Sequence, residues 1–440
     1  MKNLIPQSIK NICHLFQAVL ANVWYGFPSR KLKVIGVTGT NGKTTTVQMI
    51  AKILEEADFK IAIASTINFK IGEREWVNDT KFTTFSGFRL QEFLQKAVRA
   101  GCEYAVVEVT SHALDQNRVW GVDFSVAVVT NVTREHLDYH KTMEKYRKAK
   151  EKLFAMVSKN SDGVAVANLN MENVEDFLKY RAKQNYGYTV ISNSQLAIGD
   201  KLQITNYKLQ EIAAKKIKLD VNGSLFEING VGFKLYLPGE FNIENALAAT
   251  CVGLSQNIPL EKISEALSKI KGVPGRMERI ENDRGIEIIV DYAVTPDSLE
   301  KLYNYTKGLK EENGKVIAVF GSCGERDRGK RPIMGEIVAR CADYCIVTNE
   351  DPYNEDPQKI IDEVFAGVLK HKKENENAWR ILDRREAIKK TLQIAKPGDI
   401  VVVTGKGAEE TMAIGNERIP WNDPRVIREV LSERMKEEGR

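Results

Sequence analysis

Residues 34–46 read VIGVTGTNGKTTT, and this stretch constrains the fold more strongly than any other. An apolar run gives way to glycines and ends at Lys43 and Thr44, after which VQMIAKILEEA follows at helical spacing. A strand, a Gly-rich turn and a helix in this order are typical of phosphate-binding loops. Backbone N–H groups at a helix N-terminus attract an anion, Lys43 adds a positive charge, and the Thr44 hydroxyl is a suitable ligand for Mg²⁺. The stretch therefore predicts a nucleotide-binding loop.

The match to the strict pattern G-x-x-x-x-G-K-[ST] is incomplete. Val37 stands where that pattern requires its first glycine, between Gly36 and Gly39. A plain surface turn is the alternative interpretation. We favour the phosphate loop because both the strand before it and the helix after it are present.

The composition fits an ordinary globular protein with more than one domain. The chain has 440 residues, 43% hydrophobic and 28% charged, and its net charge of +5 is spread along its length. So small a charge gives no support to nucleic-acid binding, but it is compatible with anionic small substrates. Six cysteines without a C-x-x-C pair, and no apolar run of membrane-spanning length, predict a cytoplasmic protein. We expect a monomer.

Strand-like and helix-like stretches alternate over residues 31–168. Short β-rich runs such as KVIGVT and SVAVVTN alternate with helical patterns, which is the rhythm of a parallel sheet covered by helices. From 201 to 238 apolar and polar residues alternate around Gly-containing turns, which predicts antiparallel hairpins. After a hinge-like segment at 271–280 the α/β rhythm resumes. We therefore predict an α/β fold with a P-loop-type parallel-sheet ATPase domain that carries an antiparallel β insertion (31–274), and a Rossmann-like α/β C-terminal domain (275–440).

Residues 1–30 form a short helical segment ahead of these two domains. Ile9, Ile12, Phe16 and Val19 fall on one helical face, and an aromatic cluster follows, so this face could dock on a partner or on a membrane surface. We favour a helix that packs on the protein's own body.

Polar residues follow several of the predicted strands. Glu108 lies at the end of the run YAVVEV, and the next strand leads into TNVTREHLDYH, which carries His136, Asp138 and His140. Ligands bind at the carboxyl ends of parallel strands, so these side chains are candidates for a metal and phosphate site. Taken singly, each is as consistent with a structural residue. The helical pattern MEKYRKAKEKLF holds several lysines beside this site, and spacing alone does not select one that turns inward.

The second half carries a charged loop after a predicted strand. VFGSCGERDRGKRPIMGEI holds cationic residues that could bind a carboxylate or phosphate, namely Arg326, Arg328, Lys330 and Arg331. An exposed polar loop is an equally good interpretation. The strand ends at VTNEDPYNEDP and VTGKGAEE are rich in acid and glycine, as expected for a polar substrate that carries an amine.

Taken in order, these motifs resemble those of the Mur ligases. The matching stretches are TGTNGKTTT, EVTSHALDQNRV, TNVTREHLDYH, PGEFNIENALAA, GRME, DYAVTPDSL, FGSCGERDRGKRP, NEDPYNEDP and GKGAEE. They are most similar to the branch that adds the third amino acid to the peptidoglycan stem. The resemblance implies an ATP-dependent acid–amino-acid ligase, in which ATP phosphorylates a substrate carboxylate and an amine then attacks the acyl phosphate.

The resemblance also implies roles for individual residues. The catalytic residues would be Lys43, Glu108, His136 and Lys150, with Lys150 carbamylated and two Mg²⁺ ions held by Thr44, Glu108 and His136. ATP would contact Gly39, Thr40, Asn41, Gly42, Lys43, Thr44, Thr45, Asn242, Asn245, Arg276 and Asp291. The muramoyl peptide would contact Thr83, Thr84, Thr110, Gln116 and Arg118, and the incoming amino acid would contact Asp351, Tyr353, Gly405 and Glu409.

The chain departs from the family pattern at several places. About thirty residues precede the phosphate loop, where the family usually carries a UDP-binding domain, so we expect altered recognition of the UDP group. A lipid-linked or otherwise altered muramoyl peptide is an alternative acceptor. TTFSG replaces the usual threonine-threonine-proline turn, and Val294 and Ala408 stand where the branch has histidine.

One further departure bears on the amino acid. The DNPR signature for meso-diaminopimelate appears here as Glu350, Asp351, Pro352 and Tyr353. Without the arginine, the bidentate partner of a distal carboxylate is lost, whereas two acidic residues suit a distal ammonium. We therefore predict lysine or ornithine rather than diaminopimelate.

Two other functions are compatible with parts of the sequence. A related ligase could act on another polymer such as a folate-like polyglutamate, but SHALDQNR matches the muramoyl-peptide ligases instead. A nucleotide-binding homologue without catalysis is the second alternative, and the presence of Lys43, Glu108, His136 and Lys150 counts against it.

Overall fold

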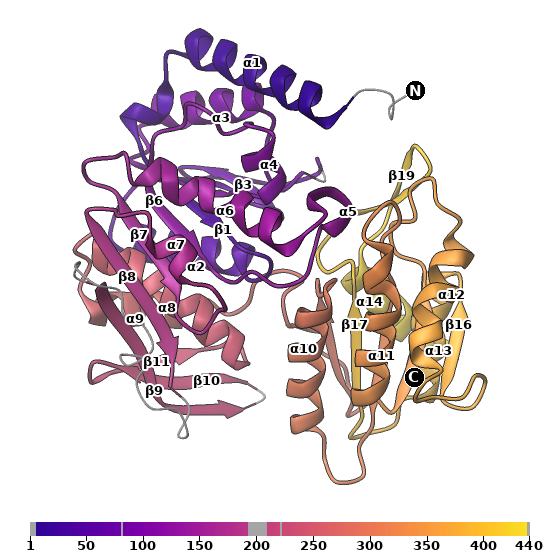
Figure 1. Ribbon diagram of the computed structural model, residues 1–440. Helices are drawn as coiled ribbons and strands as arrows, with labels where there is room; N and C mark the ends of the chain where they lie inside the picture. Colours follow the sequence, from indigo (N-terminus) through magenta and orange to yellow (C-terminus); the bar gives the residue numbers. More distant parts are fainter. Residues whose placement is uncertain (1–5, 81, 192–208, 221, 438–440) are drawn as a thin grey trace. The chain divides into compact units, whose positions relative to one another are not determined.

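The computed structural model describes residues 6–80, 82–191, 209–220 and 222–437 (Figure 1). The chain forms two compact units. The first comprises Met1–Val132 and Thr142–Lys271, and the second comprises Thr133–Lys141 and Gly272–Arg440. The short segment Thr133–Lys141 thus belongs with the C-terminal unit, which the sequence pattern did not indicate.

An eleven-stranded sheet forms the centre of the first unit, counted over the described residues. The strands are β1 (Lys33–Thr38), β2 (Ile61–Ala64), β3 (Asn68–Ile71), β4 (Arg74–Val77), β5 (Tyr104–Glu108), β6 (Phe124–Val129), β7 (Val164–Asn168), β8 (Gln184–Val190), β9 (Leu209–Asp220), β10 (Gly223–Ile228) and β11 (Val231–Leu235). They lie in the order β11-β10-β9-β8-β7-β6-β1-β5-β2-β3-β4, with parallel pairing from β9 to β2. Antiparallel hairpins extend both ends. The predicted hairpins are confirmed from residue 209 onward, and 201–208 lie outside the described residues.

Helices cover both faces of this sheet (Figure 1). They are α1 (Gln7–Tyr25), α2 (Lys43–Glu56), α3 (Gly87–Arg99), α4 (Ser111–Asp115), α6 (Met143–Val157), α7 (Glu175–Leu178), α8 (Glu240–Ser255) and α9 (Leu260–Ser268). α2 packs with α8 and α9, while α3, α4, α6 and α7 contribute to the apolar core of the opposite face. The central strand β1 is buried from its second residue onward, which explains its nearly unbroken apolar run.

A six-stranded sheet forms the centre of the second unit, counted over its described residues. Its order is β12-β13-β17-β14-β15-β16, and only the short edge strand β12 is antiparallel to its neighbour. The strands are β12 (Glu278–Arg279), β13 (Glu287–Asp291), β14 (Val316–Phe320), β15 (Tyr344–Thr348), β16 (Ala378–Ile381) and β17 (Ile400–Thr404), with a separate hairpin of β18 (Thr411–Ile414) and β19 (Glu417–Pro420). The helices are α5 (Leu137–His140), α10 (Pro296–Leu309), α11 (Arg331–Cys341), α12 (Pro357–Val368), α13 (Arg384–Ile394) and α14 (Asp423–Glu437). The predicted α/β fold class is confirmed.

α1 packs on α3 through the face opposite to the predicted one (Figure 1). A Cβ placed on Gly87, the first residue of α3, would lie 3.0 Å from the Cα of the buried Ala18. Ile9, Ile12 and Phe16, on the face predicted to pack against the protein, are exposed. The helix packs on the protein's own body, as predicted, but not through this apolar face, because small residues on the other face allow the closer approach of the two helices.

Arg384, in the first turn of α13, joins several elements of the second unit. Its guanidinium donates to both carboxylate oxygens of Asp423, at 2.8 and 2.6 Å, and to the carbonyls of Asn349 and Thr404. The side chains of Arg384 and Asp423 are 1% and 0% exposed. This buried pair connects α13 and α14 to the ends of β15 and β17.

Replacing Arg384 by alanine should destabilise the chain strongly, because Asp423 would keep a buried charge without its partner. Breaking such a pair costs about 3–5 kcal/mol. The neighbouring Arg385 binds Glu429 and Glu433 at the surface, so Arg385→Ala should cost about 0–1 kcal/mol. Urea unfolding of both variants, followed by circular dichroism, measures the difference, and equal losses would contradict the anchoring role of Arg384.

Candidate active site

The loop between β1 and α2 requires glycine at two positions. Gly39 and Gly42 have φ angles of +149° and +83°. A Cβ would lie 1.9 Å from Thr130 Oγ1 at Gly39 and 2.3 Å from Asn245 Oδ1 at Gly42. Val37, where the strict pattern has glycine, is still within β1 and needs no such freedom. The observed turn therefore has the conformation expected of a phosphate loop although the strict pattern fails.

Hydrogen bonds hold this loop at the N-terminus of α2. The Asn41 N–H donates to Asn131 Oδ1 at 2.9 Å. Lys43 Nζ donates to the carbonyls of Gly39 and Thr40, at 3.0 and 2.8 Å. The loop thus brings backbone N–H groups and a lysine ammonium together at a helix N-terminus, which is an arrangement that binds phosphate.

One lysine of α6 also reaches this loop. Lys150 is 1% exposed, its Nζ donates to the Gly39 carbonyl at 2.7 Å, and it lies 4.5 Å from the ring centroid of Tyr146. The Tyr146 hydroxyl is 3.1 Å from Thr40 Oγ1. Lys148 is exposed. The structure therefore distinguishes Lys150 from its neighbours, which spacing could not do.

Glu108 ends β5 as a fully buried carboxylate. Its Oε1 accepts from the Thr66 N–H at 2.8 Å, and its Oε2 accepts from Thr66 Oγ1 at 2.9 Å. The Thr66 hydroxyl also lies 3.1 Å from Thr83 Oγ1. Sequence reasoning missed Thr66, and the available signal was its position just after β2, the strand that pairs with β5.

The residues matched to the muramoyl peptide form one hydrogen-bonded group in the first unit. Thr84 Oγ1 donates to the Glu108 carbonyl at 2.9 Å and accepts from the Thr110 N–H at 3.0 Å. Arg118 Nη1 donates to the Thr84 carbonyl at 2.8 Å. Gln116 is the C-cap of α4. Thr110 follows the end of β5, where ligands of such sheets bind, and the other side chains come from the loop after β4 and from the end of α4.

Asn242 and Asn245 lie in the first turns of α8, against the first turn of α2. Asn245 Nδ2 donates to Asn242 Oδ1 at 3.2 Å, and Thr46 Oγ1 donates to Asn245 Oδ1 at 3.2 Å. Both asparagines are buried. The structure thus brings two residues matched to adenine contacts next to the phosphate loop.

His136 belongs to the second unit, where it precedes α5 with a left-handed backbone at φ +57°. Its neighbour Glu135 is buried and pairs with Lys330, with 2.9 Å between Nζ and Oε1. Lys330 also donates to the Val294 carbonyl at 2.8 Å. Burial raises the pKa of Glu135, and the nearby Lys330 opposes that rise. This buried pair fixes the segment that carries His136.

The predicted metal ligands come from different units. Thr44 and Glu108 belong to the first unit and His136 to the second. Across the described residues, no three His, Cys, Asp or Glu side chains converge on a point that could hold a metal ion. The metal set therefore remains a prediction.

Lys406 is the centre of a charged cluster in the second unit. This fully buried lysine donates to Asp351 Oδ1 at 2.8 Å and to Glu409 Oε2. Asp351 Oδ1 also accepts from the Ala413 N–H at 2.8 Å. Burial alone would lower the pKa of Lys406, but the carboxylates of Glu409 and Asp351 raise it. The cluster joins the predicted residues Asp351 and Glu409 through a lysine that sequence reasoning did not select.

Glu350 lies beside this cluster with a different environment. It is 4% exposed, and its Oε2 has no hydrogen-bond partner among the described residues. A Cβ on Gly405, whose φ is +112°, would lie 2.6 Å from that oxygen. Burial and the charge of Asp351 raise the pKa of Glu350 to about 7, although Arg384 and Lys406 oppose the rise. Glu350 is thus a buried acid that can change its charge near neutral pH.

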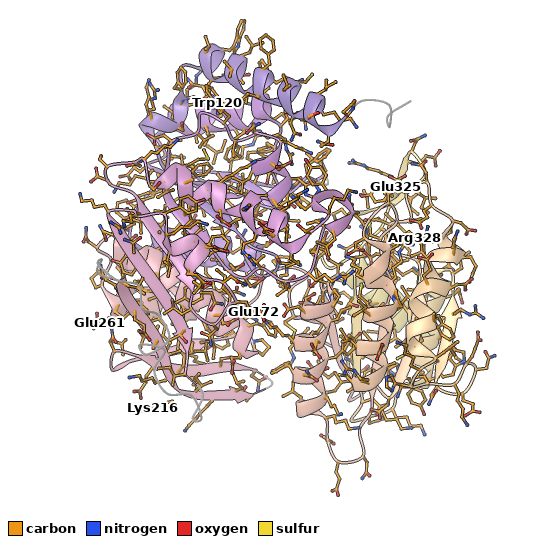
Figure 2. All side chains as sticks on the ribbon, viewed as in Figure 1. Trp120, Glu172, Lys216, Glu261, Glu325 and Arg328 are labelled. Carbon is orange, nitrogen blue, oxygen red and sulfur yellow. The ribbon has the colours of Figure 1, made fainter. Side chains whose placement is uncertain are left out.

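The charged loop before α11 mostly meets carboxylates of this chain (Figure 2). Arg331 is fully buried and donates to both oxygens of Glu355, each at 2.7 Å, and to Glu363 at 2.7 Å. The guanidinium of Arg326 lies 5.9 Å from the ring centroid of Tyr353. Arg331 therefore holds the loops together, while Arg326 and Tyr353 lie together at the predicted amino-acid site.

Arg276 lies just before β12, and Asp291 is the last residue of β13. The Arg276 guanidinium lies 4.5 Å from the ring centroid of Tyr292. Asp291 Oδ2 accepts from the Met277 N–H at 2.8 Å. Tyr292 also donates to Glu409 Oε1 at 3.5 Å. The residues matched to nucleotide contacts in this unit are thus linked to those matched to the amino acid.

Two known domain families match the sequence. The Mur ligase middle domain matches residues 37–253, and the Mur ligase, glutamate ligase domain matches residues 275–407. A protein of Roseiflexus sp. (strain RS-1) named UDP-N-acetylmuramyl-tripeptide synthetase is 39% identical over 429 residues, which cover 94% of this chain and 82% of that protein. The chain belongs to the Mur ligase family. This Mur ligase is an ATP-dependent acid–amino-acid ligase, as predicted.

Other relatives carry a more specific name. A UDP-N-acetylmuramoyl-L-alanyl-D-glutamate--2,6-diaminopimelate ligase of Bacillus cereus is 38% identical over 96% of this chain and 82% of its own length. A solved structure with the same enzyme name is 31% identical, with a TM-score of 0.59 over 92% of this chain and 79% of that one. Mycobacterium tuberculosis folylpolyglutamate synthase, complexed with ADP and AMPPCP, has a TM-score of 0.68 over 98% of this chain and 99% of that one, at 17% identity. The last comparison supports the fold alone.

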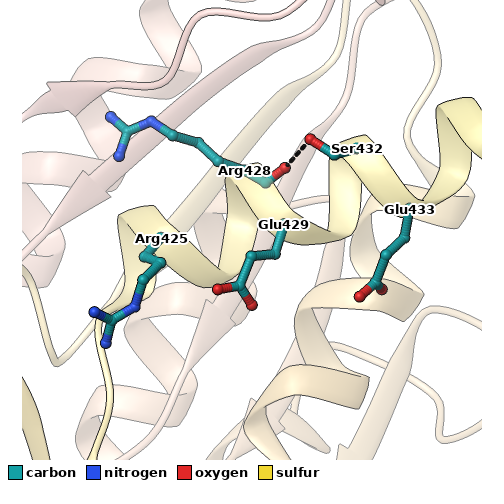
Figure 3. A pocket seen from close by; sticks show the side chains of 5 residues that line it. All are labelled: Arg425, Arg428, Glu429, Ser432 and Glu433. Carbon is teal, nitrogen blue, oxygen red and sulfur yellow. Dashed lines mark hydrogen bonds between the residues drawn. The ribbon is translucent and has the colours of Figure 1, made fainter.

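A surface cavity of about 460 Å³ lies along α14 of this Mur ligase (Figure 3). It is lined by Arg425, Arg428, Glu429, Ser432 and Glu433. Ser432 Oγ donates to the Arg428 carbonyl at 2.9 Å, a bond within the helix. None of the predicted site residues lines this cavity.

Lys43→Ala should abolish the ATP turnover of this Mur ligase, because the phosphoryl group would lose its nearest cation. Removing one such electrostatic contact costs about 100- to 1000-fold in kcat. Lys52 lies on the same helix and pairs with Glu56 at the surface, so Lys52→Ala should keep normal turnover. Phosphate release measures both variants, and a similar fall in both would contradict a specific role for Lys43.

Proposed function

We propose that this Mur ligase joins a diamino acid, L-lysine or a close analogue, to a muramoyl-L-alanyl-D-glutamate precursor of peptidoglycan. The observation that carries the proposal is the pair of Glu350 and Tyr353 at the loop after β15, where the resembling branch has aspartate and arginine. Tyrosine offers no bidentate partner for a distal carboxylate. A buried acid without a hydrogen-bond partner suits a distal ammonium.

The neighbouring charges support Glu350 as the acid that meets this ammonium. Asp351 is engaged by Lys406 and by the Ala413 N–H. The cations around Glu350 have carboxylate partners of their own, because Arg384 binds Asp423 and Lys330 binds Glu135. An incoming ammonium would therefore supply a charge partner for Glu350 that the chain itself does not provide.

The first half of the reaction uses the first unit. The D-glutamate side-chain carboxylate attacks the terminal phosphorus of ATP, the bond to the bridging oxygen breaks, and ADP leaves. Lys43 and the N–H groups of the loop bind the phosphates and stabilise the charge that shifts to them. Thr84, Thr110 and Arg118 bind the muramoyl peptide near the strand ends.

Mg²⁺ fits this half of the proposal. Both oxygens of Glu108 act as acceptors, and with the Thr44 hydroxyl they are the hard oxygen ligands that Mg²⁺ prefers. When bound, the ion would neutralise phosphate charge. We further propose that Lys150 is carbamylated, which would turn a buried ammonium into an anion that supports the metal site.

The second half of the reaction joins the amino acid. The α-amine attacks the acyl phosphate carbon, an amide bond forms, inorganic phosphate leaves with the electrons of the broken C–O bond, and the amine loses a proton to water. Gly405, Glu409 and Tyr353 hold the amino acid while Glu350 receives its distal ammonium. Exclusion of water by these residues would protect the acyl phosphate from hydrolysis.

The decisive experiment measures phosphate release from ATP with UDP-muramoyl-L-alanyl-D-glutamate and a panel of lysine, ornithine and meso-diaminopimelate. Release that requires both the acceptor and lysine or ornithine is the expected result. A clear preference for diaminopimelate would refute the proposed specificity. A parallel arm with a lipid-linked muramoyl dipeptide tests the other acceptor, and activity there alone would refute the UDP-linked one.

Replacing Glu350 by glutamine should raise the KM for lysine about 10- to 100-fold, the value of a charge-assisted hydrogen bond. Because the pKa of Glu350 is about 7, its carboxylate is ionised above that pH. The KM of the unmodified enzyme for lysine should therefore fall as pH rises through about 7, and Glu350→Gln should remove this dependence.

Glu417→Gln provides a matched control, since Glu417 is exposed on β19. Its KM and pH profile should follow the unmodified enzyme. An unchanged lysine KM in Glu350→Gln, with normal ATP turnover, would contradict the role of Glu350 and leave the ligase activity intact.

A further inference from the structure

α1 presents a row of large apolar side chains to solvent, which we name the α1 apolar row. Its residues follow one another at intervals of three or four, with one adjacent pair at the end, so they share one side of the helix. Their exposed fractions are 49% for Ile9, 66% for Ile12, 63% for Phe16, 45% for Leu20, 65% for Val23 and 79% for Trp24. No described residue of this chain covers the row.

The packing of the opposite side fixes the orientation of this row. Ala18 meets Gly87 of α3 at a distance that leaves no space for a larger residue. Asn22 Nδ2 donates to the Trp120 carbonyl at 2.8 Å, and Trp120 lies in the part of the unit that carries α1 (Figure 2). Rotating the helix to bury the apolar row would break both contacts.

The charged residues of α1 and of the segment that follows it are all basic. No Asp or Glu occurs before Glu55, whereas Lys10 lies in α1 and Arg30 and Lys31 follow it. The acidic group that α1 does contact is Asp115, which accepts from Asn11 at 3.3 Å and is paired with Lys152 at 3.2 Å. An apolar row flanked by lysine and arginine complements a surface with an apolar interior below a layer of negatively charged groups.

We propose that the α1 apolar row docks this enzyme on an anionic lipid surface. The helix would lie in the plane of the interface, with Phe16 and Trp24 among the acyl chains and Lys10, Arg30 and Lys31 against the phosphates. No helix in the described part of the chain is long and apolar enough to cross a bilayer.

Charge disfavours a second copy of the chain as the occupant. In a two-fold pair of α1 helices, the same row would face itself. Antiparallel helices would bring Lys10 of each copy near Arg30 and Lys31 of the other, and these like charges repel. Lipid phosphates provide the missing negative charge.

Sedimentation with vesicles tests the proposal. The full chain should bind vesicles of equal parts phosphatidylglycerol and phosphatidylcholine, and its binding should weaken with added salt. The double variant Ile12→Ser and Phe16→Ser should lose binding by about tenfold or more. Both side chains are exposed, so circular dichroism should show an intact fold.

Leu369→Ser is the matched control, because Leu369 is a similarly exposed apolar residue of the second unit. It should bind vesicles normally. Absence of binding to the anionic vesicles, or equal binding to vesicles of phosphatidylcholine alone, would overturn the proposal. A dimer in light scattering that the double variant converts to monomer, without vesicle binding, would also overturn it and assign the row to a second copy.

Discussion

The main-chain carbonyl of Gly39 accepts hydrogen bonds from two lysines, and the nucleotide-binding end of the first unit depends on this contact. Lys43 reaches it from α2 at 3.0 Å, and Lys150 reaches it from α6 at 2.7 Å. The two helices contribute to opposite faces of the sheet, so one oxygen ties both layers to the loop. Two cations at one carbonyl also concentrate positive charge at the loop, which favours an anion there. The carbamylation that we propose would make the Lys150 side chain an anion, while Lys43 would stay a cation.

The second unit is organised by a different principle, the pairing of buried charges. In three buried pairs, each charge is balanced by its partner: Arg384 with Asp423, Lys330 with Glu135, and Lys406 with Asp351. Such pairs cost desolvation energy and tolerate no loss of a partner, so they fix the positions of the loops that carry them. Glu350 stands apart from this scheme, because its Oε2 has no hydrogen-bond partner among the described residues. A buried polar atom without a hydrogen-bond partner can bind a polar group of a ligand.

The sequence predicts the strands, the helices and the phosphate loop well, because each depends on local periodicity or on a short motif. It also identifies Glu108, since the end of a parallel strand is recognisable from the chain. Spacing alone could not select Lys150, which only the family resemblance singled out, and nothing in the sequence revealed Thr66, because their contacts join residues 111 and 42 positions apart. The packing of α1 on the protein's own body was predicted, but the face it uses was not, because burial followed the small residue Ala18, whose fit against Gly87 is a property of the fold.

In the proposed function, specificity for the amino acid would rest on repulsion as well as attraction. Lysine and diaminopimelate both carry a distal ammonium, so an acid that binds this group attracts both of them. Diaminopimelate adds a distal carboxylate, and an ionised Glu350 with the adjacent Asp351 would repel it. An arginine at position 353 would bind the same carboxylate bidentately, whereas Tyr353 offers one hydroxyl and the guanidinium of Arg326 lies 5.9 Å from its ring centroid. Because burial raises the pKa of Glu350 to about 7, this repulsion would weaken as the acid is protonated. Discrimination against diaminopimelate should therefore be greater above that pH than below it.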